Sequence, residues 1–254
     1  MSYASVKLHQ SAAERPVEHS HRRDLLLQVL SVLAVLGVLV GLYFALIYTQ
    51  PDALQGNIQR IFYIHVPSFM AAFLGFSATV FGGIAYLRTR NPKWDTLAVA
   101  GVEVGLVMSI ITLATGSIWA RPIWNTWWTW DPRLTSAAIM ALTYAAYLML
   151  RSGIENPNHK RTFSSVYGIL AFSTVIFTFI VIRIRPDTIH PAVIGSGAEG
   201  AEGGFAMAGE MVTALMVNMV VWSALVAPTL MWWRIRLENT LQENALLKIQ
   251  IEDE

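Results

Sequence analysis

The sequence predicts an all-α, polytopic membrane protein built as a bundle of six transmembrane helices. Of its 254 residues only 14% are charged and 54% are hydrophobic, whereas a soluble domain carries about 25% charged residues. Six stretches are apolar over the roughly 20 residues that a helix needs to cross a bilayer. None of them shows the strict apolar–polar alternation of a membrane β-barrel strand.

The first stretch, 25–48, contains no charged residue and follows the basic pair Arg22 and Arg23. An export signal starts in a similar way, but its apolar core is shorter and ends at a cleavage site of small residues. We therefore expect a retained anchor. The second stretch, 68–87, follows Pro67, a residue that suits the first turn of a helix.

The third stretch, 96–119, is apolar except for Glu103. An acid within a membrane span is by default a sign of function. Because Glu103 lies toward the predicted cytoplasmic end, we expect a neutral or hydrogen-bonded packing role for it instead, with Asn218 as its partner. The remaining stretches are 134–150, 162–182 and 209–233.

The distribution of basic residues predicts the orientation, because cytoplasmic loops carry more Lys and Arg than outer ones. With the N-terminus inside, the outer segments hold five of the 18 basic residues, namely Arg60, Arg121, Arg133, Arg183 and Arg185. Both termini are then cytoplasmic, with polar tails at 1–24 and 238–254 around a membrane domain at 25–237. Five glycines within 195–204 predict a flexible outer connector.

Composition also excludes several classes of chemistry. The chain has no cysteine, which rules out disulfides, thiolate metal ligands and a cysteine nucleophile. The net charge of +1 gives no sign of a nucleic-acid partner. No GxxxxGK[ST] phosphate-binding loop is present, so we expect a binding protein without ATPase activity rather than an enzyme.

Two of the six histidines, His65 and His190, fall on the predicted outer side. The others are His9, His19, His21 and His159. A residue before proline is biased toward extended conformation, so His190, which precedes Pro191, is expected in a turn. His65, just ahead of Pro67, is expected at the membrane boundary before its helix. Imidazole is the usual axial ligand of haem iron, although a histidine at a helix end is more often incidental.

The segment 116–136 contains five of the nine tryptophans: Trp119, Trp124, Trp127, Trp128 and Trp130. An aromatic belt at headgroup depth explains one or two tryptophans at a helix end. Five in one loop, interleaved with Arg121, Asp131 and Arg133, favour a flat aromatic platform for a large planar ligand such as a porphyrin. Indole rings supply such contact area at little entropic cost.

The outer arginines are candidate partners for the two propionates of a haem, because a guanidinium pairs with a carboxylate in a bidentate manner. For Arg183 and Arg185, at the end of the fifth stretch, reaching the lipid headgroups is an alternative. Asp131 is expected to fix the loop, either by capping the fourth helix or by pairing with Arg133.

The segment from Gly116 to Ser136, GSIWARPIWNTWWTWDPRLTS, resembles the tryptophan-rich "WWD" motif of haem-handling proteins of cytochrome c assembly. The six spans, the length and the flanking His65 and His190 are similar to the haem exporter protein C family, CcmC. The resemblance covers nearly all of 25–237. It departs at Asn125, where the motif usually has glycine.

The resemblance implies haem b bound at the periplasmic face of a bacterial inner membrane, with its iron held axially by His65 and His190. The tryptophan segment would contact the porphyrin. The haem would pass to the periplasmic chaperone CcmE. Further implied partners are the ABC transporter subunits CcmA and CcmB and the small membrane protein CcmD.

Two other functions stay open at this point. An electron-transfer membrane subunit usually carries paired histidines inside the bilayer, yet no predicted membrane core contains one. A permease component of a haem transporter would place its site near the bilayer midplane, where only Glu103 and Asn218 offer polar groups.

Overall fold

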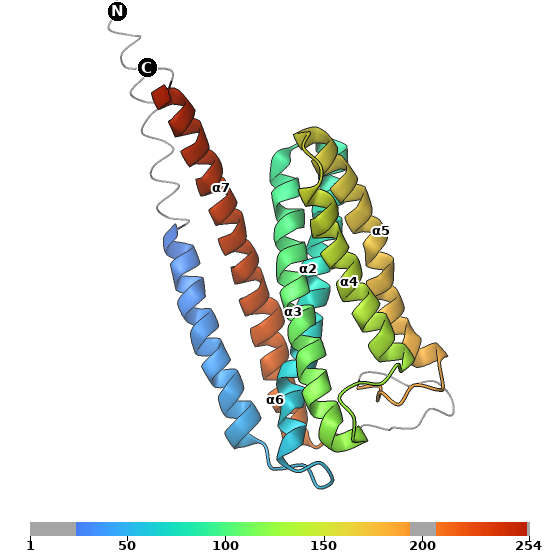
Figure 1. Ribbon diagram of the computed structural model, residues 1–254. Helices are drawn as coiled ribbons and strands as arrows, with labels where there is room; N and C mark the ends of the chain where they lie inside the picture. Colours follow the sequence, from blue (N-terminus) through green and yellow to red (C-terminus); the bar gives the residue numbers. More distant parts are fainter. Residues whose placement is uncertain (1–23, 194–206, 253–254) are drawn as a thin grey trace, which may run out of the picture.

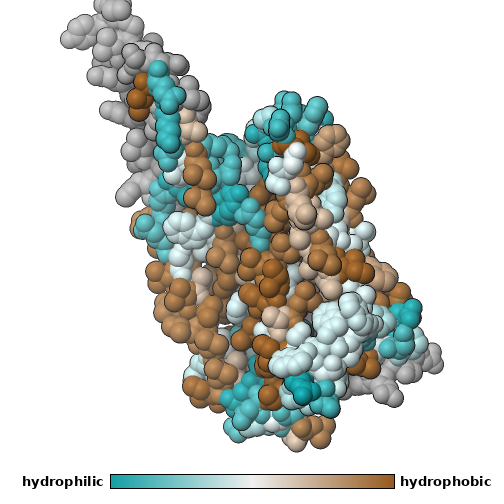
Figure 2. Space-filling view, viewed as in Figure 1, coloured by the Kyte–Doolittle hydropathy of each residue, from teal (hydrophilic) through white to brown (hydrophobic). Residues whose placement is uncertain are grey.

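The computed structural model describes residues 24–193 and 207–252. The N-terminal tail with its three histidines and the glycine-rich connector at 195–204 lie outside the described residues. The prediction of an all-α membrane fold is confirmed, because six helices are long and apolar enough to cross a membrane. Figure 2 shows hydrophobic residues across the middle of one face and hydrophilic residues toward its ends.

Figure 1 shows the spans side by side, with α2 and α3 at the centre. The first span, Asp24–Tyr48, ends in a π-helical turn, η1 (Phe44–Tyr48). The 3-10 helix η2 (Asn57–Ile61) leads into α2 (Phe62–Thr89), which is followed by α3 (Pro92–Trp124), α4 (Pro132–Ser152) and α5 (Pro157–Ile184). The last span combines α6 (Gly209–Met219), the π-helix η3 (Val220–Val226) and α7 (Ala227–Glu252).

Three helices begin with the same two-residue signal. Asn91, Asp131 and Asn156 are the N-caps of α3, α4 and α5, and a proline follows each of them. Each side chain accepts a hydrogen bond from a main-chain N–H of the first turn, a group that otherwise has no partner in the helix. Proline fits the next position because it has no N–H to satisfy.

The second span starts earlier than predicted, so the expectation that His65 precedes its helix is wrong. His65 and Pro67 both lie inside α2. The helix extends toward the loop because Phe62 and Tyr63 are fully buried, and burying such rings outweighs the hydrogen bond that Pro67 cannot make.

The centre of the bundle is packed closely enough to require glycine. A methyl group added to Gly75 of α2 would lie 2.8 Å from the main-chain oxygen of Gly101 in α3. Beside this contact, the ring of Phe76 stacks on that of Tyr144 in α4, with centroids 3.6 Å apart. The resulting core joins α2, α3, α4 and α5.

The expected partner of Glu103 is also wrong. The Glu103 carboxylate pairs with the Arg234 guanidinium of α7, whereas the Asn218 amide donates to the main-chain oxygen of Gly41 at 3.1 Å. Arg234 lies just beyond the predicted last span, on a helix that packs against α3. Glu103 is therefore a charged partner in an ion pair rather than a neutral packing group.

Candidate functional site

A cavity of about 480 Å³ opens at the end of the bundle that carries His65 and His190, which we call the histidine end. Residues of α2, α3, α4 and α5 line it, together with the loops before α2, α4 and α6. Most of the wall is apolar, from side chains such as Phe69, Leu134 and Phe179. A largely apolar cavity with a few convergent polar groups is the usual form of a small-molecule site.

His65 is held by α3 in one orientation. Its Nδ1 lies 3.0 Å from the main-chain oxygen of Thr112 and 3.2 Å from the Thr115 hydroxyl. Because a carbonyl oxygen only accepts, the hydrogen resides on Nδ1 and Nε2 keeps its lone pair. Gly116 makes room for the ring, since a Cβ there would lie 2.9 Å from the Cε1 atom of His65.

His190 lies in the loop after α5, and its ring is held in a similar tautomer. Its Nδ1 is 3.0 Å from the main-chain oxygen of Pro191. Burial lowers the pKa of His190 to about 3, with further contributions from the nearby Arg133 and His65. The imidazole is therefore neutral at physiological pH, with the Nε2 lone pair available to a metal.

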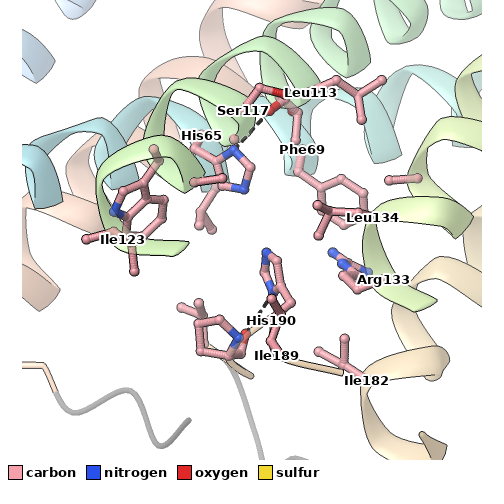
Figure 3. A pocket seen from close by; sticks show the side chains of 18 of the residues that line it. His65, Phe69, Leu113, Ser117, Ile123, Arg133, Leu134, Ile182, Ile189 and His190 are labelled. Carbon is pink, nitrogen blue, oxygen red and sulfur yellow. Dashed lines mark hydrogen bonds between the residues drawn. The ribbon is translucent and has the colours of Figure 1, made fainter. Parts of the chain in front are cut away.

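The two imidazoles face one another across the cavity. Their centroids are 6.3 Å apart and their planes differ by 34°. In Figure 3 the ring nitrogens that make no hydrogen bond point toward each other. A metal–imidazole bond is about 2 Å long and the nitrogen lies roughly 1 Å from the ring centre, so two rings on opposite sides of one metal have centroids about 6 Å apart. The observed separation fits that arrangement.

Two histidines alone supply only two of the ligands that a protein-bound metal usually has. Among the described residues, no group of three or more His, Cys, Asp or Glu side chains could hold a metal ion. Two facing imidazoles can supply the axial ligands of a metal whose equatorial ligands come from a bound group, as in a porphyrin. Both Nδ1–H groups donate to main-chain oxygens, which is the usual arrangement around metal-bound histidine.

Three of the five tryptophans line the cavity: Trp119, Trp124 and Trp128. Trp119 meets His65 edge to face, with centroids 5.9 Å apart, and Trp124 meets His190 at 6.5 Å. The Trp128 Nε1 is buried and has no hydrogen-bond partner among the described residues. This donor can serve a polar group of a bound ligand.

The other two tryptophans do not line the cavity and are exposed. Trp127 is 59% exposed and Trp130 is 80% exposed. Trp130 and Trp128 lie nearly perpendicular, at 81°. The five indoles thus do not form one flat platform, because the chain turns between them. Asn125 ends α3 in the left-handed conformation, with φ of 55°, which explains why glycine suits this position of the motif.

The structure separates the outer arginines into two sets. Arg133 and Arg183 line the cavity. Arg133 donates to the main-chain oxygen of Thr178, and its guanidinium lies 4.5 Å from the centre of the Phe69 ring. Both charges are thus brought to one side of a mostly apolar cavity, where they favour an anionic group.

Three predicted arginines lie elsewhere and have other partners. Arg60 donates to the main-chain oxygens of Leu46 and Thr49. Arg121 donates to the main-chain oxygen of Asn125 at 2.6 Å. Arg185 pairs with Asp187 at 2.6 Å, and that hydrogen bond raises the pKa of Arg185. None of these three lines the cavity.

Asp131 does not line the cavity either. It caps α4, and its second oxygen accepts the main-chain N–H of Ile189 at 2.8 Å.

Sequence reasoning missed Gln55, which lines the cavity and accepts the indole N–H of Trp119 at 2.8 Å. A glutamine in a polar loop carries no pattern that could have revealed this contact.

Residues 8–250 match the family described as Heme exporter protein C. The chain is 33% identical over 165 residues to Heme exporter protein C of Rhodobacter capsulatus, covering 65% of this chain and 67% of that one. It is 32% identical over 151 residues to the Escherichia coli K12 protein of the same name, covering 58% and 59%. A "Putative cytochrome c biosynthesis ccmC-like mitochondrial protein" of Arabidopsis thaliana is 35% identical over 109 residues, 43% of each chain. The matched segments thus span about two thirds or less of these relatives.

Proposed function

Because the chain belongs to the haem exporter protein C family, whose role is haem handling for cytochrome c maturation, we propose that it holds haem b at the periplasmic face and delivers it to the chaperone CcmE. The observation that carries this proposal is the pair of imidazoles at 6.3 Å with facing Nε2 lone pairs. His65 and His190 would be the two axial ligands, and haem supplies the iron and its equatorial nitrogens.

The walls of the cavity support one orientation of the ligand. Arg133 and Arg183 lie on the side formed by α4 and α5, and we assign the propionates to that side because guanidinium groups bind carboxylates well. Trp119 and Trp124 would contact the porphyrin by their ring edges and exclude water. The buried Trp128 N–H would donate to a polar group of the ligand.

The exposed Trp127 and Trp130 would form the contact surface for CcmE, since aromatic side chains are enriched at protein interfaces. Their position beside the cavity favours transfer over a short distance. CcmA, CcmB and CcmD are the further partners that we propose from the family. The small number of basic residues in the outer segments supports a periplasmic histidine end and cytoplasmic termini.

The alternatives receive less support. A midplane permeation site would need free polar groups, yet Glu103 is in an ion pair and Asn218 is hydrogen-bonded to main chain. An electron-transfer subunit usually has histidines on facing helices in the bilayer, whereas His190 lies in a loop outside the helices.

The test is to purify the chain with haem and compare absorption spectra of wild type, His65→Ala and His190→Ala. We expect each variant to lose one axial ligand, to lose the low-spin spectrum and to fail in loading CcmE. His159→Ala is the matched control, because His159 lies at the opposite end against Phe163. Wild-type spectra and normal loading in both site variants would reject the proposal.

A further inference from the structure

The two histidines are held to the bundle in different ways. His65 belongs to α2, and its ring bonds to residues of a second helix, α3. His190 belongs to no helix, and its ring bonds to the residue next to it in the chain. A bond between neighbours fixes the direction of the ring but does not fix the loop to the bundle.

Within the described loop segment 186–193, Asp187 pairs with the adjacent Arg185, and one further hydrogen bond joins the segment to a distant part of the described chain. It runs from the main-chain N–H of Ile189, the neighbour of His190, to an oxygen of Asp131 at 2.8 Å. Asp131 is itself immobilised, since its other oxygen accepts the main-chain N–H groups of Arg133 and Leu134. Its side chain is buried, with 7% of the residue exposed.

The Asp131 carboxylate thus connects two segments with one oxygen each. One segment is the first turn of α4, and the other is the loop that carries His190. A hydrogen bond from a main-chain N–H to a buried carboxylate is roughly twice as strong as one between neutral groups. Breaking it would leave the described segment with the local Arg185–Asp187 pair, the ring contact of His190 with Trp124 and the apolar packing of Val193.

We propose that Asp131 is a positioning residue that holds His190 opposite His65, and that it decides whether a bound haem has one or two protein ligands. This inference rests on the proposed function of His190 as an iron ligand. It assigns Asp131 no contact with haem, and it specifies the loop-fixing role that the sequence predicts for this residue.

The decisive variants are Asp131→Asn and Asp131→Ser in the full chain, purified with haem. Asparagine and serine both cap helices well, but neither offers a second oxygen to the Ile189 N–H. We expect both variants to lose most of the low-spin signal, as His190→Ala does, and added imidazole to restore it. Asn156→Ala is the control for lost capping alone, because Asn156 caps α5 at the opposite end. It should keep the wild-type spectrum.

A measurement without haem separates the two claims. Amide hydrogen exchange of segment 187–193 in the haem-free protein should be at least tenfold faster in the Asp131 variants, and unchanged in Asn156→Ala. Wild-type exchange and wild-type spectra in both Asp131 variants would overturn the inference. If wild-type protein itself binds haem without two histidine ligands, the proposed function fails, and the exchange rates still report whether Asp131 holds the loop.

Discussion

Of the central helices α2 to α5 and the two flanking spans, which are the first and the last, α3 and the first span differ most in burial. In α3, 56% of the apolar membrane segment is buried, whereas in the first span the share is 11%. The central helices meet through glycines and stacked rings. The first span is tied to the last one by polar contacts, such as Trp233 to Ser31 at 2.7 Å and Arg236 to Asp24 at 2.8 Å.

This difference indicates which helices fix the positions of the residues around the cavity. His65, Gly116 and Arg133 all sit on central helices, and van der Waals packing between such helices tolerates little displacement. Gln55, in the loop that connects the first span to α2, lines the cavity, whereas the described residues of the first and last spans do not line it. Changes in the centre should therefore disturb haem binding, and changes in the flanking spans should not.

The largest effect is expected for Gly101→Ala. The new methyl would collide with the main-chain oxygen of Gly75, and the Thr79 main chain lies 2.9 Å away. Backbone cannot yield, so α2 and α3 must separate, at a loss of about 3 kcal/mol of stability. Thermal denaturation in detergent measures it. Gly153→Ala is the control, because its nearest neighbours lie 3.8 Å away. Equal melting temperatures for both variants would contradict the close central packing.

A smaller effect on stability, with a strong effect on the site, is expected for Gly116→Ala. The methyl would press on the imidazole of His65, 2.9 Å away at Cε1. A side chain can move, so the fold should lose only about 1 kcal/mol. The His65 ligand should nevertheless be displaced, and the haem spectrum should resemble that of His65→Ala. A wild-type spectrum would show that the ring does not depend on this glycine.

The smallest effect is expected for Asn218→Ala in the flanking pair. The variant loses the bond from the Asn218 amide to the Gly41 oxygen, and interhelical hydrogen bonds in membranes contribute about 0.6 kcal/mol on average. The melting temperature should fall slightly while the haem spectrum stays unchanged. Altered axial ligation would remove the distinction between centre and flank.

Hydropathy could predict the six spans, because each is a long apolar run with few charges. The second span begins at Phe62 rather than at Ser68, because Pro67, which suits a first turn, lies inside the helix when the apolar residues before it, Phe62 and Tyr63, are buried. The capping role of Asp131 follows from the residue pair Asp131–Pro132, a local signal that the sequence contains.

The geometry of the site was less accessible to sequence reasoning. His65 and His190 could be assigned to one side of the membrane, but their distance depends on how α2 and the loop after α5 pack. Which tryptophans line the cavity depends on the turn at Asn125. The sequence also shows that Arg60 and Arg185 are charged, but not where their side chains point. In the structure both have nearby partners outside the cavity.

The main-chain oxygens of Thr112 and Pro191 limit how the two ligand positions can be redesigned. A methionine or lysine in place of either histidine would bring one donor atom to the iron and no second nitrogen for that oxygen. Its direction would then be unanchored, and the oxygen would lose its partner. An engineered change of axial ligand in this scaffold must therefore supply a new anchor on the neighbouring backbone as well as a new ligand atom.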